Sequence, residues 1–414
     1  MPVCPQRAAI SGSLRWALEY ATKAYGLRDR VTERERLHIS ATYFKATGEF
    51  EKESQTYELW IANYPRDLVP RGNLGTIYES IGQYEKALAE YQEELQNAPD
   101  DVGGYDNLAA TYLALNRLDE AKATFDQALK HKLDDGSLRG TMYWLAFLRV
   151  DSAQMEQELA WGAGKPGDED QLLSAQSDTE AYYGRMSKAR DFSRRAVDSA
   201  IRSDSKETAA LWQANAALRE AELGNIAAAK QGVMGALALS PGRDVKVAAA
   251  LALARMGDAH RATALVRELE KSFASNTLLK LYWLPTINAA IELNHGNSAQ
   301  ALMYLETAAP YELGSAGTFI NYLQPAYVRG QASLLAHNGN AAASEFQKLL
   351  DHRGIVLNFV TGALAHLQLA RAYALTGDTA KAKGAYQDFF ILWKDADPDI
   401  PILKEAKAEY AKLQ

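Results

Sequence analysis

The chain has 414 residues, of which 47% are hydrophobic and 23% charged, as in an ordinary globular or repeat protein. The formal net charge of −7 argues against a binder of the nucleic-acid backbone, and the single cysteine, Cys4, excludes an internal disulfide. No apolar run approaches the ~20 residues of a membrane span, and the N-terminus lacks the apolar core of a secretion signal. We therefore expect a cytoplasmic protein that neither inserts into membranes nor binds nucleic acid.

The first residues differ from the rest of the chain. Residues 1–13 show no periodic pattern, and we predict a disordered tail there. Residues 14–26 carry apolar side chains at helical spacing, which predicts a helix that forms only half of a helix pair. This half pair is either an N-terminal cap or the downstream part of something longer.

Hydrophobic periodicity predicts helix pairs along the next part of the chain. Their ranges are 32–47 with 50–62, 67–81 with 84–97, 101–115 with 118–131, and 137–149 with 152–162. Thr32 begins the first of these helices, and Glu35 completes a capping box with it. The loop at 164–170 is rich in Gly, Pro and charge, which predicts a break between one array at 14–163 and a second at 170–398.

The second array follows the same scheme. Its predicted pairs are 170–184 with 187–202, 206–223 with 226–239, 243–256 with 259–272, 276–295 with 298–308, 318–337 with 340–351, and 356–376 with 379–394. A glycine is expected at each turn, namely Gly184, Gly224, Gly257, Gly296, Gly339 and Gly377. The Asn or Asp that follows five of them is expected to N-cap the next helix. Residues 399–414 predict a capping helix that begins at Asp399.

A pattern of small and aromatic residues recurs in these pairs. Its clearest copy is Leu74, Gly75, Tyr78, Gly82, Ala87 and Tyr91, and 34 residues later stand Leu108, Ala109, Tyr112, Asn116, Ala121 and Phe125. This period and pattern are identified as the tetratricopeptide repeat (TPR). The resemblance implies an all-α, right-handed TPR superhelix, an α-α solenoid of about ten helix pairs, because one pair cannot bury its own apolar face.

Two longer stretches carry a narrower resemblance. Residues 27–37, which lead into 57–67, and residues 392–401 are similar to the TPR-rich C-terminal region of bacterial eukaryotic-like serine/threonine protein kinases. The resemblance implies a partner-binding or sensing arm. The kinase motifs themselves are absent, since the chain has no Val-Ala-x-Lys, His-Arg-Asp or Asp-Phe-Gly sequence. We therefore expect no catalysis by this chain and no cofactor.

Three patterns that suggest chemistry have simpler explanations. Residues 162–167 match G-x-G-x-x-G, but a helix precedes them and Pro166 interrupts them, which predicts an ordinary loop. Asp395, Asp397 and Asp399 alternate as in a calcium loop, but the required glycine and final glutamate are missing. The seven histidines are not paired at helical spacing, so no metal site is expected.

The concave face of the superhelix is the remaining candidate site. In a TPR, the residue before the Leu of Leu-Gly faces this side, and amides stand there in four repeats: Asn73, Asn107, Asn215 and Gln368. An amide both donates and accepts, so a ladder of amides can pair with the backbone of an extended peptide. Asparagine ladders of this kind occur in the family. The alternative is that they are isolated polar residues on a hydrated surface.

These observations predict a scaffold or sensor module that binds a protein or an extended peptide and has no catalysis of its own. It would be an interaction module, for example the regulatory part of a bacterial serine/threonine kinase. The alternative is a non-catalytic subunit of an enzyme complex, such as a signalling kinase or transferase. A small-molecule sensor that uses groove aromatics such as Trp283 is a third possibility. The sequence leaves the partner, the pathway and the oligomeric state open.

Overall fold

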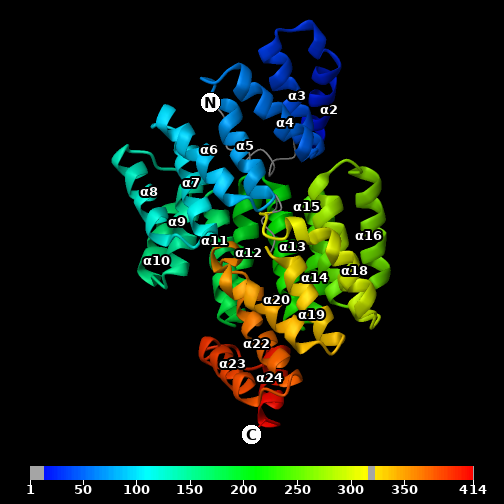
Figure 1. Cartoon of the computed structure of the whole chain (residues 1–414). Coiled ribbons are helices and arrows are strands. Elements are labelled where there is room, and N and C mark those ends of the chain that lie inside the picture. The colour runs from blue at the N-terminus through cyan, green and yellow to red at the C-terminus, as the bar shows by residue number, and fades with distance from the viewer. Residues whose placement is uncertain (1–13, 316–321, 414) are drawn as a thin grey trace.

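The computed structural model describes residues 14–315 and 322–413, and within these ranges all regular structure is helical (Figure 1). Ten successive helix pairs, with one helix before and one after them, occupy the described residues. The pairs are α3 (Glu33–Thr47) with α4 (Phe50–Asn63), α5 (Val69–Ser80) with α6 (Tyr84–Asn97), α7 (Val102–Ala114) with α8 (Leu118–Lys130), α9 (Gly136–Leu148) with α10 (Ser152–Gly162), α11 (Glu169–Tyr182) with α12 (Met186–Arg202), α13 (Lys206–Glu222) with α14 (Ile226–Leu239), α15 (Arg243–Arg255) with α16 (Ala259–Ser272), α17 (Leu284–Asn294) with α18 (Ser298–Ala308), α19 (Gln324–Leu335) with α20 (Gly339–Asp351), and α22 (Val360–Leu375) with α23 (Thr379–Leu392). The flanking helices are α2 (Leu14–Gly26) and α24 (Pro401–Ala411). The predicted all-α superhelix is confirmed.

The repeat pattern explains how the two helices of a pair approach each other. Gly75 on α5 lies against Tyr91 on α6, and a Cβ atom at Gly75 would be 2.5 Å from the Tyr91 ring. Tyr91 and Ala87 are fully buried between the helices. Gly82 ends the first helix with a φ of 77°, a left-handed conformation that glycine adopts at little cost. The small residues of the repeat pattern thus allow the close approach of the two helices and the tight turn between them.

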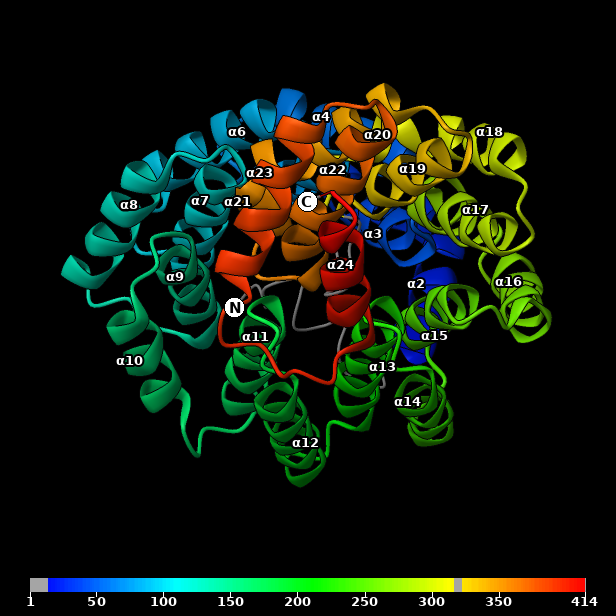
Figure 2. The same ribbon diagram turned by 90° about the horizontal axis from the view of Figure 1, so that it is seen from below.

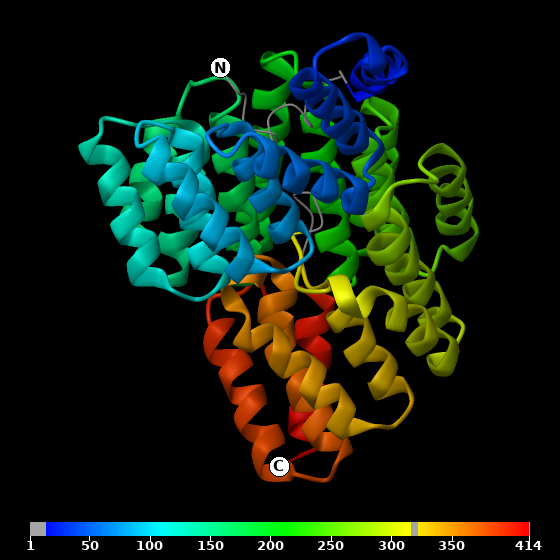
Figure 3. The ribbon, with the colours of Figure 1, turned by 45° about the horizontal axis from the view of Figure 1, so that its top comes forward.

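The helix pairs follow a superhelical path that closes into a ring. Figure 2 shows α6–α18 around the circumference, with α22–α24 over the centre. Figure 3 shows the blue and cyan N-terminal pairs directly against the orange C-terminal pairs. One hydrophobic cluster joins the two parts, since Tyr84, Ala181 and Leu223 belong to the same cluster as Phe389 and Leu403. The end of the superhelical turn therefore packs on its beginning.

The contact between the later part of the chain and the earlier pairs, which we call the seam, is made by the turns inside several of the earlier pairs. At the α3–α4 turn, the amide of Thr277 donates to the carbonyl of Gly48 over 2.9 Å. At the α5–α6 turn, the Tyr84 hydroxyl donates to the carbonyl of Leu313 over 2.7 Å. At the α11–α12 turn, the amide of Asp397 donates to the carbonyl of Gly184 over 3.0 Å. The turn residues thus serve two purposes, because they reverse the chain and also hold the later pairs.

Asn116 makes the most complete contact of the seam. It occupies the left-handed turn position of α7–α8, with a φ of 57°. Its side-chain amide donates to the carbonyl of Asp351 over 2.9 Å, and its side-chain oxygen accepts from the amide of Gly354 over 3.0 Å. A Cβ atom at Gly354 would lie 1.7 Å from the carbonyl oxygen of Leu113, so only glycine fits there.

Two predicted helices are interrupted. The segment predicted as a helix at 276–295 contains a π-helical turn, η2 (Leu279–Trp283), before α17. The segment predicted as a helix at 356–376 starts where a short helix, α21 (Arg353–Val356), ends; the chain breaks at Leu357, whose φ is 55°, and α22 begins only at Val360. Asn358 at the break is 1% exposed and donates to the carbonyl of Ala175 over 2.7 Å. A contact with a distant pair therefore overrides the local helical pattern.

Several predicted turn and cap residues are placed differently. His337, with a φ of 57°, occupies the left-handed position that was predicted for Gly339. Asp258 and Asp378 cap their helices as expected, but the amides after three of the turn glycines do not. Asn225 and Asn297 donate instead to glutamates of the preceding helix, and Asn338 caps α20 in place of Asn340. α24 begins at Pro401 without a side-chain cap, so Asp399 is not its N-cap.

The predicted tail at 1–13 lies outside the described residues. The predicted division into arrays at 14–163 and 170–398, with a cap at 399–414, stays a prediction about folding units. In the structure α11 contacts both α9 and α10, so the helices pack continuously past the loop at 164–168. Among the described helices, none is both long enough and apolar enough to cross a bilayer.

Candidate functional site

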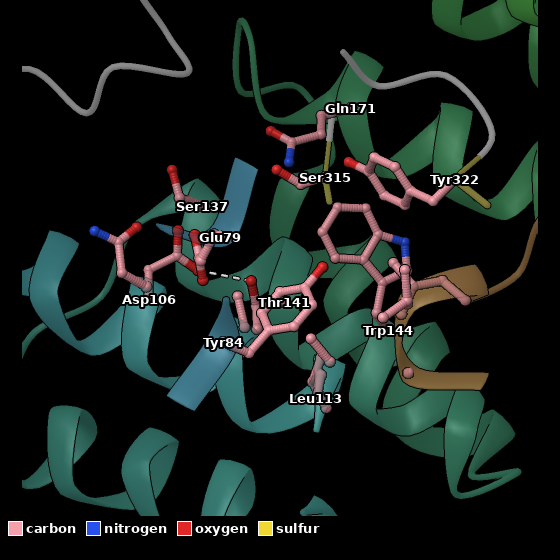
Figure 4. A pocket seen from close by; sticks show the side chains of 16 residues that line it. Glu79, Tyr84, Asp106, Leu113, Ser137, Thr141, Trp144, Gln171, Ser315 and Tyr322 are labelled. Carbon is pink, nitrogen blue, oxygen red and sulfur yellow. Dashed lines mark hydrogen bonds between the residues drawn. The ribbon is translucent and has the colours of Figure 1, made fainter. Parts of the chain in front are cut away.

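A cavity of about 110 Å³ lies on the inner side of the ring. Its wall is formed by the first helices of four consecutive pairs, α5, α7, α9 and α11. Ser315 and Tyr322 close it from one side, and the end of α21 closes it from another. Because the first helices of TPR pairs line the concave face, this cavity is the covered part of the groove that the sequence predicted. Figure 4 shows its side chains.

Two carboxylates stand in the wall. Glu79 is the second-last residue of α5, and its oxygens accept from the Thr111 hydroxyl over 2.5 Å and from the Tyr91 hydroxyl over 3.2 Å. Asp106 on α7 accepts from the Thr141 hydroxyl over 2.6 Å. Both residues are buried, with exposed fractions of 9% and 4%. These neutral donors hold the carboxylates in fixed positions at the cavity.

The electrostatics of Glu79 follow from its burial. The pKa of Glu79 is raised to about 7, mainly because burial disfavours the charged form. The hydrogen bonds from Thr111 and Tyr91 oppose this rise, and the nearby charge of Asp106 adds to it. No lysine or arginine of the described chain is among the groups that shift this pKa. Near neutral pH, both the protonated and the charged form of Glu79 are therefore populated.

Aromatic and amide groups complete the lining. In Figure 4, Trp144 of α9 and Tyr322 lie on the side opposite Glu79 and Asp106. The ring of Tyr84 forms part of the floor and is fixed by its hydrogen bond to Leu313. Gln171 contributes an amide from α11. The cavity thus offers negative charge on one side and aromatic rings on the other.

The residues that close the cavity come from the seam. The amide of Ser315 donates to the carbonyl of Glu79 over 3.2 Å. Gly354 and Leu357 enter from the far end of the chain. Sequence reasoning missed this part of the site, because these residues lie more than 200 positions from α5. The sequence offers one signal of this contact: Gly354 and Asn358 stand inside an otherwise apolar stretch, which suggests a close backbone approach and a buried polar contact there.

The four predicted groove amides are in different environments. Asn107 lines the cavity and is partly exposed. Asn73 is also partly exposed, and its side chain accepts from Lys45 over 2.9 Å and donates to the carbonyl of Val69 over 2.7 Å. The structure therefore brings only Asn107 to the cavity.

Asn215 and Gln368 are buried, each with 4% exposure. Asn215 donates to the carboxylate of Asp178 over 3.2 Å, and Gln368 donates to the Tyr327 hydroxyl over 3.5 Å. The amide ladder as a whole stays a prediction. Trp283, considered above for a sensor, is 2% exposed inside the largest apolar cluster, so it does not line a groove.

The described residues contain no group of three or more His, Cys, Asp or Glu side chains arranged to hold a metal ion. The arrangement around the cavity suits binding by charge, ring faces and amides.

Comparisons with known proteins give one family match. Residues 64–142 match the family model described as tetratricopeptide repeat. A comparison with curated protein sequences finds no match. Similar solved structures include yeast Tom70, 12% identical over 95% of this chain and 96% of that chain, with a TM-score of 0.38. Human IFIT1, solved as a dimer with PPP-AAAA, is 16% identical over 88% of this chain and 85% of that chain, with a TM-score of 0.46.

A tetratricopeptide repeat protein from Parabacteroides merdae is 13% identical over 82% of this chain and 98% of that chain, with a TM-score of 0.27. At such identities a likeness concerns the fold alone. The family match and the ten helix pairs of the described chain, with their repeated small and aromatic residues, support a tetratricopeptide repeat protein.

Proposed function

We propose that the chain is a protein-binding scaffold that holds an extended segment of a partner polypeptide on the inner side of its N-terminal pairs. The observation that carries the proposal is the cavity between α5, α7, α9 and α11. It is a concave, partly apolar site with a few fixed polar groups, the combination that recognition sites use for specificity. In a TPR scaffold such a site anchors one residue of a longer segment.

For Asn107 and Asn73 we propose the backbone-binding role that the sequence suggested. Asn107 stands at the edge of the cavity and Asn73 lies on the neighbouring first helix, so both can contact the backbone of a segment that crosses α5 and α7. Backbone contacts supply affinity without sequence preference, and the cavity supplies selection of one side chain.

Photo-crosslinking tests this proposal. A benzophenone amino acid at position 137, on the rim of the cavity, is expected to crosslink a polypeptide partner that mass spectrometry identifies. The same group at Ile391, which is 68% exposed on α23, is the control position. The Asn73→Ala/Asn107→Ala double variant is expected to lose capture. Asn97→Ala, an exposed amide of α6, is expected to keep it. Equal crosslinking from positions 137 and 391 would move the binding surface elsewhere.

We further propose, from the resemblance of residues 27–67 and 392–401, that the scaffold is the non-catalytic, regulatory part of a bacterial serine/threonine kinase system in the cytoplasm, with no role in nucleic-acid binding. The alternative is a non-catalytic subunit of another enzyme complex. An in-frame kinase upstream of Met1, or a kinase among the crosslinked partners, favours the first. Phosphotransfer by the purified chain alone would contradict both.

A further inference from the structure

We propose that the cavity receives the side chain of a lysine or arginine from the bound polypeptide. This inference rests on the proposed function and specifies which residue of the partner it selects. It is argued from the charge, the size and the aromatic residues of the cavity.

Charge gives the first argument. Glu79 and Asp106 bring two carboxylates to one cavity wall from adjacent first helices. The described partners of the Glu79 carboxylate are the hydroxyls of Thr111 and Tyr91, which donate hydrogen bonds but carry no charge. A buried carboxylate without a nearby cation is costly, and a cation within a few ångströms removes much of this cost. A positively charged group is therefore the ligand that the wall favours.

The size of the cavity gives the second argument. A dry protein cavity of roughly 150 Å³ holds one benzene molecule. The volume of about 110 Å³ therefore accommodates the end of one side chain and excludes a folded segment or a large cofactor. A lysine or arginine side chain also brings the apolar stem that Leu113 and Ile355 in the lining would contact.

The aromatic residues give the third argument. Trp144 and Tyr322 face the cavity from the side opposite the carboxylates, as Figure 4 shows. A cation in the cavity is attracted by the carboxylates and by the aromatic rings across from them, and cation–π contacts are strongest where water is excluded. An acidic side chain would be repelled by the carboxylates, and an uncharged one would lack the charge–charge attraction. The overall charge of −7 also favours approach of a basic segment.

The proton on Glu79 provides a signature of this mode of binding. Because the pKa of Glu79 is about 7 in the empty cavity, part of the population carries a proton near neutral pH. An incoming cation lowers this pKa and expels the proton. The titratable groups that face Glu79 are Tyr84 and Tyr91 of α6, Asp106 of α7, and Tyr322.

The experiment uses arrays of short extended peptides with one varied position, which is lysine, arginine, norleucine or glutamate, probed with the full-length chain. Lysine or arginine is expected to bind about tenfold more tightly than norleucine, which has a stem of similar shape but no charge. Calorimetry in buffers of different ionisation enthalpy is expected to show proton release at pH 7 for the lysine and arginine peptides and not for the norleucine and glutamate peptides.

Variants distinguish binding by the two cavity carboxylates from non-specific attraction by the negative charge of the whole protein. Glu79→Gln and Asp106→Asn keep oxygen acceptors for Thr111 and Thr141, and both are expected to remove the preference for lysine and arginine. Glu53→Gln changes another buried glutamate, on α4 and outside the cavity, and is expected to keep the preference. Thermal unfolding of each variant verifies that it is folded.

The outcomes distinguish this inference from the proposed function. Peptides bound equally well with lysine and norleucine would overturn the inference and leave the scaffold function standing. A preference that survives in Glu79→Gln and Asp106→Asn would also overturn it. If no peptide binds, the scaffold function fails, and butylammonium is then used as a probe. Stabilisation of the wild type but not of Glu79→Gln by this amine would assign the cavity to a free amine and overturn the side-chain assignment.

Discussion

Glu79 carries a prediction about pH. Its pKa of about 7 lies above the value of 4.5 for an exposed glutamate, because burial disfavours the charged form. The folded state therefore holds a proton that the unfolded state has lost, and the associated stability is present below pH 4.5 and is lost as pH rises to about 7. Raising the pH from 5 to 8 should cost the wild type about 2–3 kcal/mol through this residue.

Glu79→Gln should remove this dependence, so the variant gains stability relative to the wild type at pH 8 and not at pH 5. Denaturant unfolding at both pH values measures the difference. Glu51→Gln, at an exposed position, is the control and should leave the wild-type profile unchanged. Parallel profiles of Glu79→Gln and wild type would mean that Glu79 is charged in the folded protein.

At the level of single residues, the sequence predicted those whose role is local. The repeat pattern identified Gly75 and Tyr91 as a small and a large residue of one pair, and the structure places them against each other. Glu79 could not be recognised, since a glutamate near the end of a helix is normally exposed, and it is buried here by Ser315 and the neighbouring pairs. Asn215 and Gln368 show the opposite case. Their positions in the repeat predict exposure on the groove, but the packing of the ring buries both.

At the level of helix pairs, the contact between Gly75 and Tyr91 predicts opposite effects of one substitution at two sites. Gly75→Ala places a methyl group 2.5 Å from the Tyr91 ring and should destabilise the chain by about 1–3 kcal/mol. Gly384→Ala, on α23, places it in open space and should stabilise by about 0.5–1 kcal/mol, because alanine is the better helix former. Thermal and denaturant unfolding measure both, and equal effects would contradict the predicted packing.

The pairs themselves were predictable, because apolar periodicity and turn residues are local signals. The interruptions at η2 and at Leu357 were not. Val360–Leu375 and the residues before it form one apolar stretch, which locally favours a single helix. The break is imposed by Asn358, whose partners Ala175 and Thr179 lie in another pair. Tertiary hydrogen bonds at a buried position outweigh the modest helix propensity of a few residues.

At the level of the whole molecule, the sequence predicted a superhelix but not its closure. The seam joins residues that lie more than 200 positions apart, such as Asn116 with Gly354 and Gly48 with Thr277. No repeat pattern encodes such a contact, since each TPR pair specifies only its neighbours. The closure matters for function, because Ser315 and Gly354 of the seam also line the cavity.

Two turn glycines with nearly the same backbone conformation allow the stability contributed by the seam to be measured apart from the strain at the turn. Gly82 and Gly296 have φ values of 77° and 76°, so alanine costs a similar backbone strain at each. At Gly82 the new methyl group would lie 2.8 Å from Leu313, whereas at Gly296 it would meet nothing within 4 Å. Gly82→Ala should therefore destabilise by about 1–2 kcal/mol more than Gly296→Ala.

Hydrogen exchange gives this prediction a local measurement. The amide of Ser315 is bonded to the carbonyl of Glu79 at the α5–α6 turn, so it reports directly on the seam. In Gly82→Ala this amide should exchange faster, and the same change is not expected in Gly296→Ala. Because Ser315 also closes the cavity, Gly82→Ala should weaken capture of the lysine peptides as well. If Gly82→Ala loses the expected stability but the Ser315 amide exchanges at the wild-type rate, the substitution disturbs only the α5–α6 pair. In that case the seam does not control the cavity.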